Sequence, residues 1–150
     1  MFIMQVSPRL KREYPNLYDA IYKILGEVPK KPQVWKAFLK YSELNSTQAY
    51  TALTTCSATP IIDYRVMPSA NGQFSGGTDK NRVYLAKSIC EHFKNNSGER
   101  NSAKMLLLLE STLLHELVHW GDWKDGKDQA GEEGKAFERA AYGRDINRYW

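Results

Sequence analysis

The chain has 150 residues, of which 42% are hydrophobic and 25% are charged, and its formal net charge is +4. This length and apolar content suit one compact domain with its own core, which we expect to span residues 1–150. Basic residues are scattered and form no dense run, which argues against a nucleic-acid partner.

The start of the chain lacks the charged segment and the long apolar run of a secretory signal, and no apolar stretch reaches the ~20 residues of a membrane span. We therefore expect a protein that is cytoplasmic, or one that is exported as an effector by a signal-independent route. Cys56 and Cys90 are compatible with two free thiols or with one disulfide. Their spacing is not that of zinc ligands.

Helices dominate the predicted N-terminal part of the chain. Apolar residues recur at helical spacing from residue 9, with an early interruption at Pro15 and a stop at Gly26. The predicted helices cover residues 9–26, 33–44 and 48–55. Nothing in these segments suggests chemistry, and we expect them to pack against the core.

A small sheet is predicted next. Residues 61–66 and 82–86 are rich in β-branched and aromatic side chains, a Gly- and Pro-containing loop over 68–77 separates them, and a short helix follows over 87–95. An edge strand beside a metal-binding helix would suit an extended peptide substrate. An ordinary sheet strand is an equal alternative.

The main chemical signal lies in a long apolar helix that Asn101 or Ser102 can cap and that we expect to end near Trp120, with Gly121 as its stop. This helix carries the pattern HExxH at residues 115–119. Positions four apart on a helix lie on one face, so both imidazoles can reach one ion, and the glutamate lies on the same turn.

These residue types suit zinc chemistry. Zinc binds the imidazole nitrogens of His115 and His119 and activates water for attack on a carbonyl, and a carboxylate beside that water, here Glu116, can accept its proton. Two solvated histidines on an amphipathic helix are the alternative, but the helix is apolar on almost every side and so is predicted to be buried. The remaining histidine, His92, is assigned a structural role.

The last predicted helix covers residues 131–143. Glu133 shares a face with Phe137, Ala140 and Ala141, so its carboxylate is predicted to point inward, where it needs a partner or a metal. Glu132 would need only a modest rotation to replace it. Surface capping by both glutamates is the alternative.

This pattern resembles the gluzincin metallopeptidases, in which a second helix supplies a glutamate after HExxH. The stretch over residues 133–138 looks like the Glu-Gly-x-Ala sequence of gluzincin aminopeptidases, and residues 115–143 resemble small bacterial toxin-type metallopeptidase domains. The gap from His119 to Glu133 is shorter than in large gluzincins. An aspartate ligand of the aspzincin kind therefore stays open, with three candidates: Asp122, Asp125 and Asp128. No third histidine follows, which excludes the metzincin pattern.

The resemblance implies His115, His119 and Glu133 as ligands of one Zn²⁺ and Glu116 as the general base. Glu132 or Asp125 could replace Glu133. Such sites usually add a donor for the oxyanion of the tetrahedral intermediate, and Tyr142 is the candidate, with core packing as its alternative. Glu138, or Asp122 from just beyond the metal helix, could orient a ligand histidine.

We therefore expect an α+β, zincin-like single domain with a helical N-terminal part, a small sheet, a central HExxH helix and a C-terminal ligand helix. Its expected function is zinc-dependent hydrolysis of peptide bonds in a peptide or protein substrate, as a bacterial toxin or effector protease, with scope for an immunity or inhibitor protein as partner. The alternative is a non-catalytic, zinc-stabilised binding module with a protease-like fold. The presence of Glu116 favours catalysis, because a purely structural site has no use for it.

Overall fold

The computed structural model describes residues 6–54, 60–76, 79–124 and 133–150. The elements in chain order are α1 (Pro8–Glu13), α2 (Pro15–Glu27), η1 (Val28–Lys30), α3 (Pro32–Ser42), α4 (Ser46–Thr54), β1 (Ile61–Arg65), β2 (Gly72–Gln73), β3 (Arg82–Ala86), α5 (Lys87–Asn95), η3 (Ser97–Glu99), α6 (Ala103–Lys124) and α7 (Glu133–Tyr142). Helices combined with a small sheet confirm the predicted α+β class. Among the described residues, no helix is both long and apolar enough to span a membrane.

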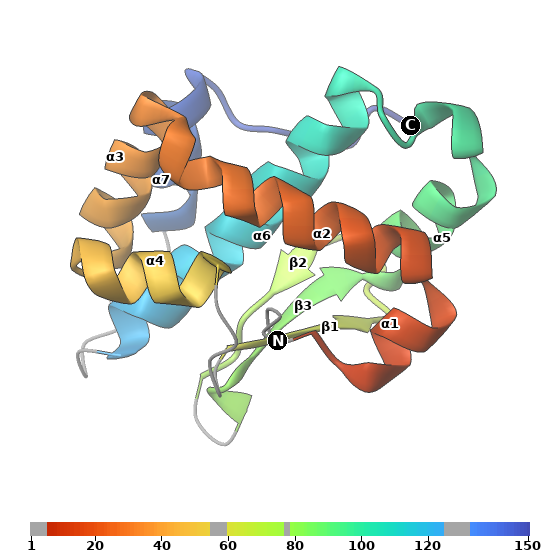
Figure 1. Cartoon of the computed structure of the whole chain (residues 1–150), viewed down its shortest axis with the longest axis horizontal. Helices are drawn as coiled ribbons and strands as arrows, with labels where there is room; N and C mark the ends of the chain where they lie inside the picture. Colours follow the sequence, from red (N-terminus) through yellow and green to blue (C-terminus); the bar gives the residue numbers. More distant parts are fainter. Residues whose placement is uncertain (1–5, 55–59, 77–78, 125–132) are drawn as a thin grey trace.

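Helix α6 occupies the centre of the fold. It contacts α2, α3, α7, β2 and β3, and Figure 1 shows α2 crossing it on one side. The leucines at 108, 109, 113, 114 and 117 are at most 1% exposed, and their positions point in several directions around the helix. The helix is therefore buried on most sides, as its apolar sequence predicts. Its first turn is capped by Ser102, whose hydroxyl accepts from the amide of Met105 at 3.2 Å.

The sheet brings a short edge strand against the HExxH segment. Its order is β1-β3-β2, with β1 parallel and β2 antiparallel to β3. The sequence predicted β1 and β3 but placed residues 68–77 in a loop, because a two-residue strand leaves no alternating pattern. A Cβ at Gly72 would lie 2.9 Å from the carbonyl oxygen of Tyr84 and 3.0 Å from Cγ of Glu116. Strand β2 can approach α6 this closely because residue 72 has no side chain.

The predicted end of the central helix at Trp120 is wrong, because α6 continues through Gly121 to Lys124. A Cβ at Gly121 would lie 2.7 Å from the carbonyl oxygen of Ser42 and 3.1 Å from Cγ of Leu44. Gly121 therefore allows the end of α3 to pack closely on α6 rather than stopping the helix. Asp122, expected just beyond the metal helix, lies within it and is fully buried.

A buried carboxylate ties the N-terminal part to the sheet. Asp63 on β1 is 5% exposed and accepts from the Ser7 hydroxyl at 2.8 Å, while its two oxygens each lie 2.9 Å from a guanidinium nitrogen, one of Arg9 and one of Arg82. Burial alone would raise the pKa of Asp63. The hydrogen bonds from Arg9, Ser7 and the Tyr64 amide outweigh it, so the pKa lies below its usual value.

This network predicts an acid-dependent loss of stability. Because the folded state lowers the pKa of Asp63, its contribution is present above the unfolded pKa of about 3.9 and is lost as the pH falls toward the folded value. Asp63→Asn should lower the free energy of unfolding at pH 7 by about 1–3 kcal/mol. Urea unfolding at pH 7 and pH 3 measures both effects. A difference between wild type and variant that is equal at both pH values would contradict this role.

Candidate active site

The residues of the HExxH motif lie together on the C-terminal half of α6. The ring centroids of His115 and His119 are 5.1 Å apart and the ring planes are inclined by 57°. Both imidazoles are half-buried, and Glu116 between them is 8% exposed. The structure therefore brings both histidines to one side of the helix, as their spacing predicts.

His115 is held in place by Glu138 of α7. Its Nδ1 hydrogen-bonds Oε2 of Glu138, and Oε1 of the same carboxylate accepts from the amide of Ile146 at 2.7 Å. Burial alone would lower the pKa of His115, but the hydrogen bond with Glu138 and the negative charges of Glu116 and Glu138 together outweigh it, so the pKa is raised. The contact anticipated for Glu138 is thus present. Because Nδ1 is engaged, Nε2 is the nitrogen that His115 can offer to a metal.

The backbone of α7 lies directly against the His115 ring. A Cβ built at Gly134 would overlap Nε2, Cδ2 and Cε1 of His115, and Gly134 itself is buried. A residue with any side chain would push the ring aside or move the helix. This close approach explains physically why a glycine follows Glu133.

Glu133 begins α7, and it points an unsatisfied carboxylate oxygen into the protein. Its Oε2 is buried and has no hydrogen-bond partner among the residues that the structure describes. A buried carboxylate oxygen is costly unless a cation or a donor compensates it. The alternative ligands Glu132, Asp125 and Asp128 lie outside the described residues.

The donors fit zinc in kind but are not assembled around one point. Within the described parts of the chain, no three His, Cys, Asp or Glu side chains are grouped to hold a metal ion. In favour of a fit, Glu138 orients the His115 ring, and Oε2 of Glu133, the neighbour of Gly134, is buried without a partner among the described residues. Nitrogen and carboxylate donors of this kind are typical zinc ligands. Side-chain rotation would be needed to bring all of them to one ion.

Glu116 combines burial with a polar cavity. Desolvation raises the pKa of its carboxyl group to about 7, partly offset by the nearby His115. The cavity beside it has a volume of about 440 Å³ and is lined by loop residues before β2, by α6, by α7 and by the C-terminal segment. The lining residues are Ser69, Ala70, Asn71, Gly72, Thr112, His115, Glu116, Lys135, Glu138, Asp145, Ile146 and Asn147.

Tyr142, the predicted oxyanion donor, does not line this cavity. Its hydroxyl donates to Oε2 of Glu110 at 2.7 Å, and Lys31 Nζ lies 2.6 Å from the other oxygen of that carboxylate. Burial and the neighbouring Glu110 raise the pKa of Tyr142 far above its usual value. The observed contacts are those of a packing residue that joins α7 to α6.

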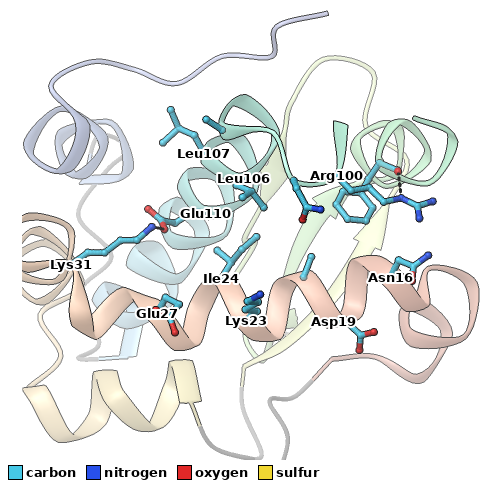
Figure 2. Close-up of a pocket in the computed structure, with 14 residues that line it drawn as sticks. Asn16, Asp19, Lys23, Ile24, Glu27, Lys31, Arg100, Leu106, Leu107 and Glu110 are labelled. Atoms are coloured by element: carbon cyan, nitrogen blue, oxygen red, sulfur yellow. Dashed lines mark hydrogen bonds and ion pairs between the residues drawn. The ribbon is translucent and has the colours of Figure 1, made fainter. Parts of the chain in front are cut away.

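A larger cavity of about 660 Å³ lies on the other face of α6 (Figure 2). It is formed by α2 together with the N-terminal half of α6, where Leu106, Leu107 and Glu110 contribute. By helical periodicity, these three residues face away from Thr112, His115 and Glu116. Size alone would favour this groove, but His115 and Glu116 of the HExxH motif line the smaller cavity.

The C-terminal segment is the part of the site that the sequence did not predict. Asp145, Ile146 and Asn147 line the cavity, and Arg148 donates to Oδ1 of Asn71 at 2.7 Å and to the carbonyl of Ala70 at 3.0 Å. No periodic pattern marks such an irregular segment. The only available signal was the Glu138 carboxylate, which was expected at the site and which binds the Ile146 amide.

His92 lies elsewhere, as expected for a structural histidine. Its Nε2 is 3.0 Å from Oε1 of Glu99, and its ring stacks on Trp150 with centroids 3.7 Å apart.

Comparison with known proteins gives one family. A family model described as Metallopeptidase toxin 3 matches residues 10–143, which is most of the chain. No curated protein and no solved structure gives a significant match. The matched range includes both the HExxH motif and α7, so it covers the whole candidate site except the C-terminal segment.

The contact between Gly134 and His115 can be tested directly. Gly134→Ala should displace the ring or the helix and lower the free energy of unfolding by about 1–3 kcal/mol. Gly98→Ala is the matched control, because a Cβ there meets nothing within 4 Å. Chemical denaturation of both variants measures the difference. Equal stability of the two variants would show that α7 does not approach His115 this closely.

Proposed function

Because this chain belongs to the metallopeptidase toxin 3 family, we propose that it hydrolyses peptide bonds with a single zinc ion held by His115, His119 and Glu133. The observation that carries this proposal is the contact between the two helices of the site. Glu138 fixes Nδ1 of His115, and Gly134, the neighbour of Glu133, lies against the opposite edge of the same ring. This contact supports α7 as the element that would supply the third ligand, Glu133.

The donor set supports zinc over calcium or magnesium. Imidazole nitrogens suit zinc, whereas calcium and magnesium prefer sites built from oxygen ligands. When bound, zinc supplies Lewis-acid polarisation of the scissile carbonyl and of water. The Glu138 carboxylate keeps the His115 ring oriented for binding, and such outer contacts typically matter about 10–100-fold for metal affinity or activity.

The chain's own acid–base group is Glu116. Its carboxylate accepts a proton from the attacking water and returns it to the nitrogen of the leaving amine, which leaves the enzyme unchanged after each cycle. The cavity that Glu116 lines is shared with Gly72 of β2, so the reacting group faces the edge of the sheet. The burial of Glu116 limits competing water around the reacting bond.

Strand β2 is the proposed platform for the substrate. It is at one end of the three-stranded order, and among the described strands it pairs only with β3. An extended peptide can add to such an edge through main-chain hydrogen bonds, which are tolerant of sequence. The approach of Gly72 to Glu116 would then bring the peptide backbone to the acid–base group.

The family assignment supports a peptidase with a protein substrate and gives no support to the alternative of a non-catalytic binding module. We extend the proposal to action as an effector on a target protein outside the producing cell. A cell that makes such a peptidase needs to block it, which favours an immunity or inhibitor protein as partner. Co-purification from the producing organism would test for that partner.

Replacing the acid–base group separates metal binding from turnover. Glu116→Gln keeps the size of the side chain but cannot accept the proton, so peptide hydrolysis should fall roughly 10²–10⁴-fold. Bound zinc should stay at the wild-type level, because Glu116 is not among the proposed ligands. Hydrolysis of a fluorogenic protein substrate and metal analysis of the same sample give both values.

The matched control is Glu27→Gln, which replaces an exposed glutamate of α2. This variant should hydrolyse the substrate at the wild-type rate. Normal turnover by Glu116→Gln would refute the mechanism. Loss of zinc from that variant would instead place Glu116 among the ligands.

A further inference from the structure

The charges that line the catalytic cavity are unevenly compensated. Glu138 is hydrogen-bonded to His115 and to the Ile146 amide, and Asp145 pairs with Arg139 at 3.0 Å. Lys135, which lines the same cavity, has no hydrogen bond or ion pair with any residue that the structure describes. Among the groups that the structure describes, none therefore compensates this cation of the cavity.

Lys135 lies at the same cavity as the acid–base group Glu116. Lys135 is on the first turn of α7, directly after Gly134, whose backbone lies against the His115 ring. Its side chain is exposed, and the cavity that it lines also includes Glu116 and Gly72. A substrate that runs along β2 toward Glu116 therefore enters a space that Lys135 borders.

A substrate carboxylate is the group that this arrangement favours. The charge of Asp145 is offset by Arg139, and the Glu138 carboxylate is already engaged by His115 and by the Ile146 amide, so both oppose an incoming anion less than free carboxylates would. Lysine is a compact, mobile cation that can follow a carboxylate at a partly exposed site. At ordinary salt concentrations, its charge attracts an anion over a screening length of roughly 8–10 Å.

We propose that Lys135 binds a carboxylate of the substrate close to the scissile bond, so that the peptidase prefers substrates with an acidic group at that subsite. The inference rests on the proposed peptidase function and names its substrate class. The carboxylate can belong to an Asp or Glu side chain or to the free C-terminus of the peptide. Lys135 is a specificity residue and takes no part in proton transfer.

The experiment uses labelled peptides of one sequence in which a single Glu is moved along the chain. Each peptide has a twin with Gln at the same position, and each is made with a free and with an amidated C-terminus. Values of kcat and KM are measured for wild type, Lys135→Gln, Lys135→Glu and the control Lys36→Gln, which removes an exposed lysine of α3. Binding to Glu116→Gln, with and without Lys135→Gln, is measured by fluorescence anisotropy.

For one position of Glu, or for the free C-terminus, wild type should favour the acidic peptide by about tenfold in kcat/KM, mainly through KM, as a charge-assisted contact predicts. The preference should vanish in Lys135→Gln, reverse in Lys135→Glu, persist in Lys36→Gln and weaken in high salt. An effect confined to moved Glu residues identifies a side-chain subsite. An effect confined to amidation identifies a C-terminal subsite.

Equal rates for acidic and neutral twins in wild type, or a preference that survives Lys135→Gln, would overturn the inference while leaving the peptidase function intact. If wild type cleaves neither twin, the proposed function fails, and the anisotropy data still decide the inference. Tighter binding of acidic peptides that depends on Lys135 would support it. Equal binding of both twins would refute it.

Discussion

The close approach of α7 to α6 at Gly134 is the constraint on which the candidate site depends. The missing side chain at residue 134 lets the α7 backbone lie against His115, and one turn further along α7 the Glu138 carboxylate holds the other side of that imidazole. Glu133, the proposed third ligand, is the first residue of the same helix. Any residue larger than glycine at position 134 would disturb the orientation of His115.

The elements that a periodic pattern of apolar residues marks could be predicted from the sequence. Apolar residues at helical spacing gave the helices, and the apolar stretch before His115 predicted a buried central helix, as found. The prediction that Gly121 ends the central helix is wrong because glycine occurs both at helix ends and at close helix contacts. Only the position of Ser42 in the structure distinguishes these two cases. Strand β2 was missed because two residues cannot show a period.

The site likewise combines residues that local spacing predicts with residues that only the folded structure brings together. Residues four apart on one helix are neighbours by geometry, so His115 and His119 could be paired from sequence alone. The inward face predicted for α7 likewise indicated Glu133, whose buried Oε2 lacks a partner within the described part of the chain. The cavity wall around Ile146 and Arg148 depends on contacts between residues far apart in the chain, which no local pattern encodes. Tyr142 was placed at the site by analogy, and its hydroxyl instead binds Glu110.

The most direct test of the account is the zinc content per chain of wild-type protein and of Glu133→Ala, purified in parallel without added metal. The account predicts one zinc in the wild type and a loss or marked weakening of binding in the variant, because the ligand from α7 is gone. One zinc in both proteins would contradict the role of Glu133 and move the third ligand to Glu132 or to an aspartate. No bound zinc in the wild type, and none taken up on titration, would contradict the metal site as a whole.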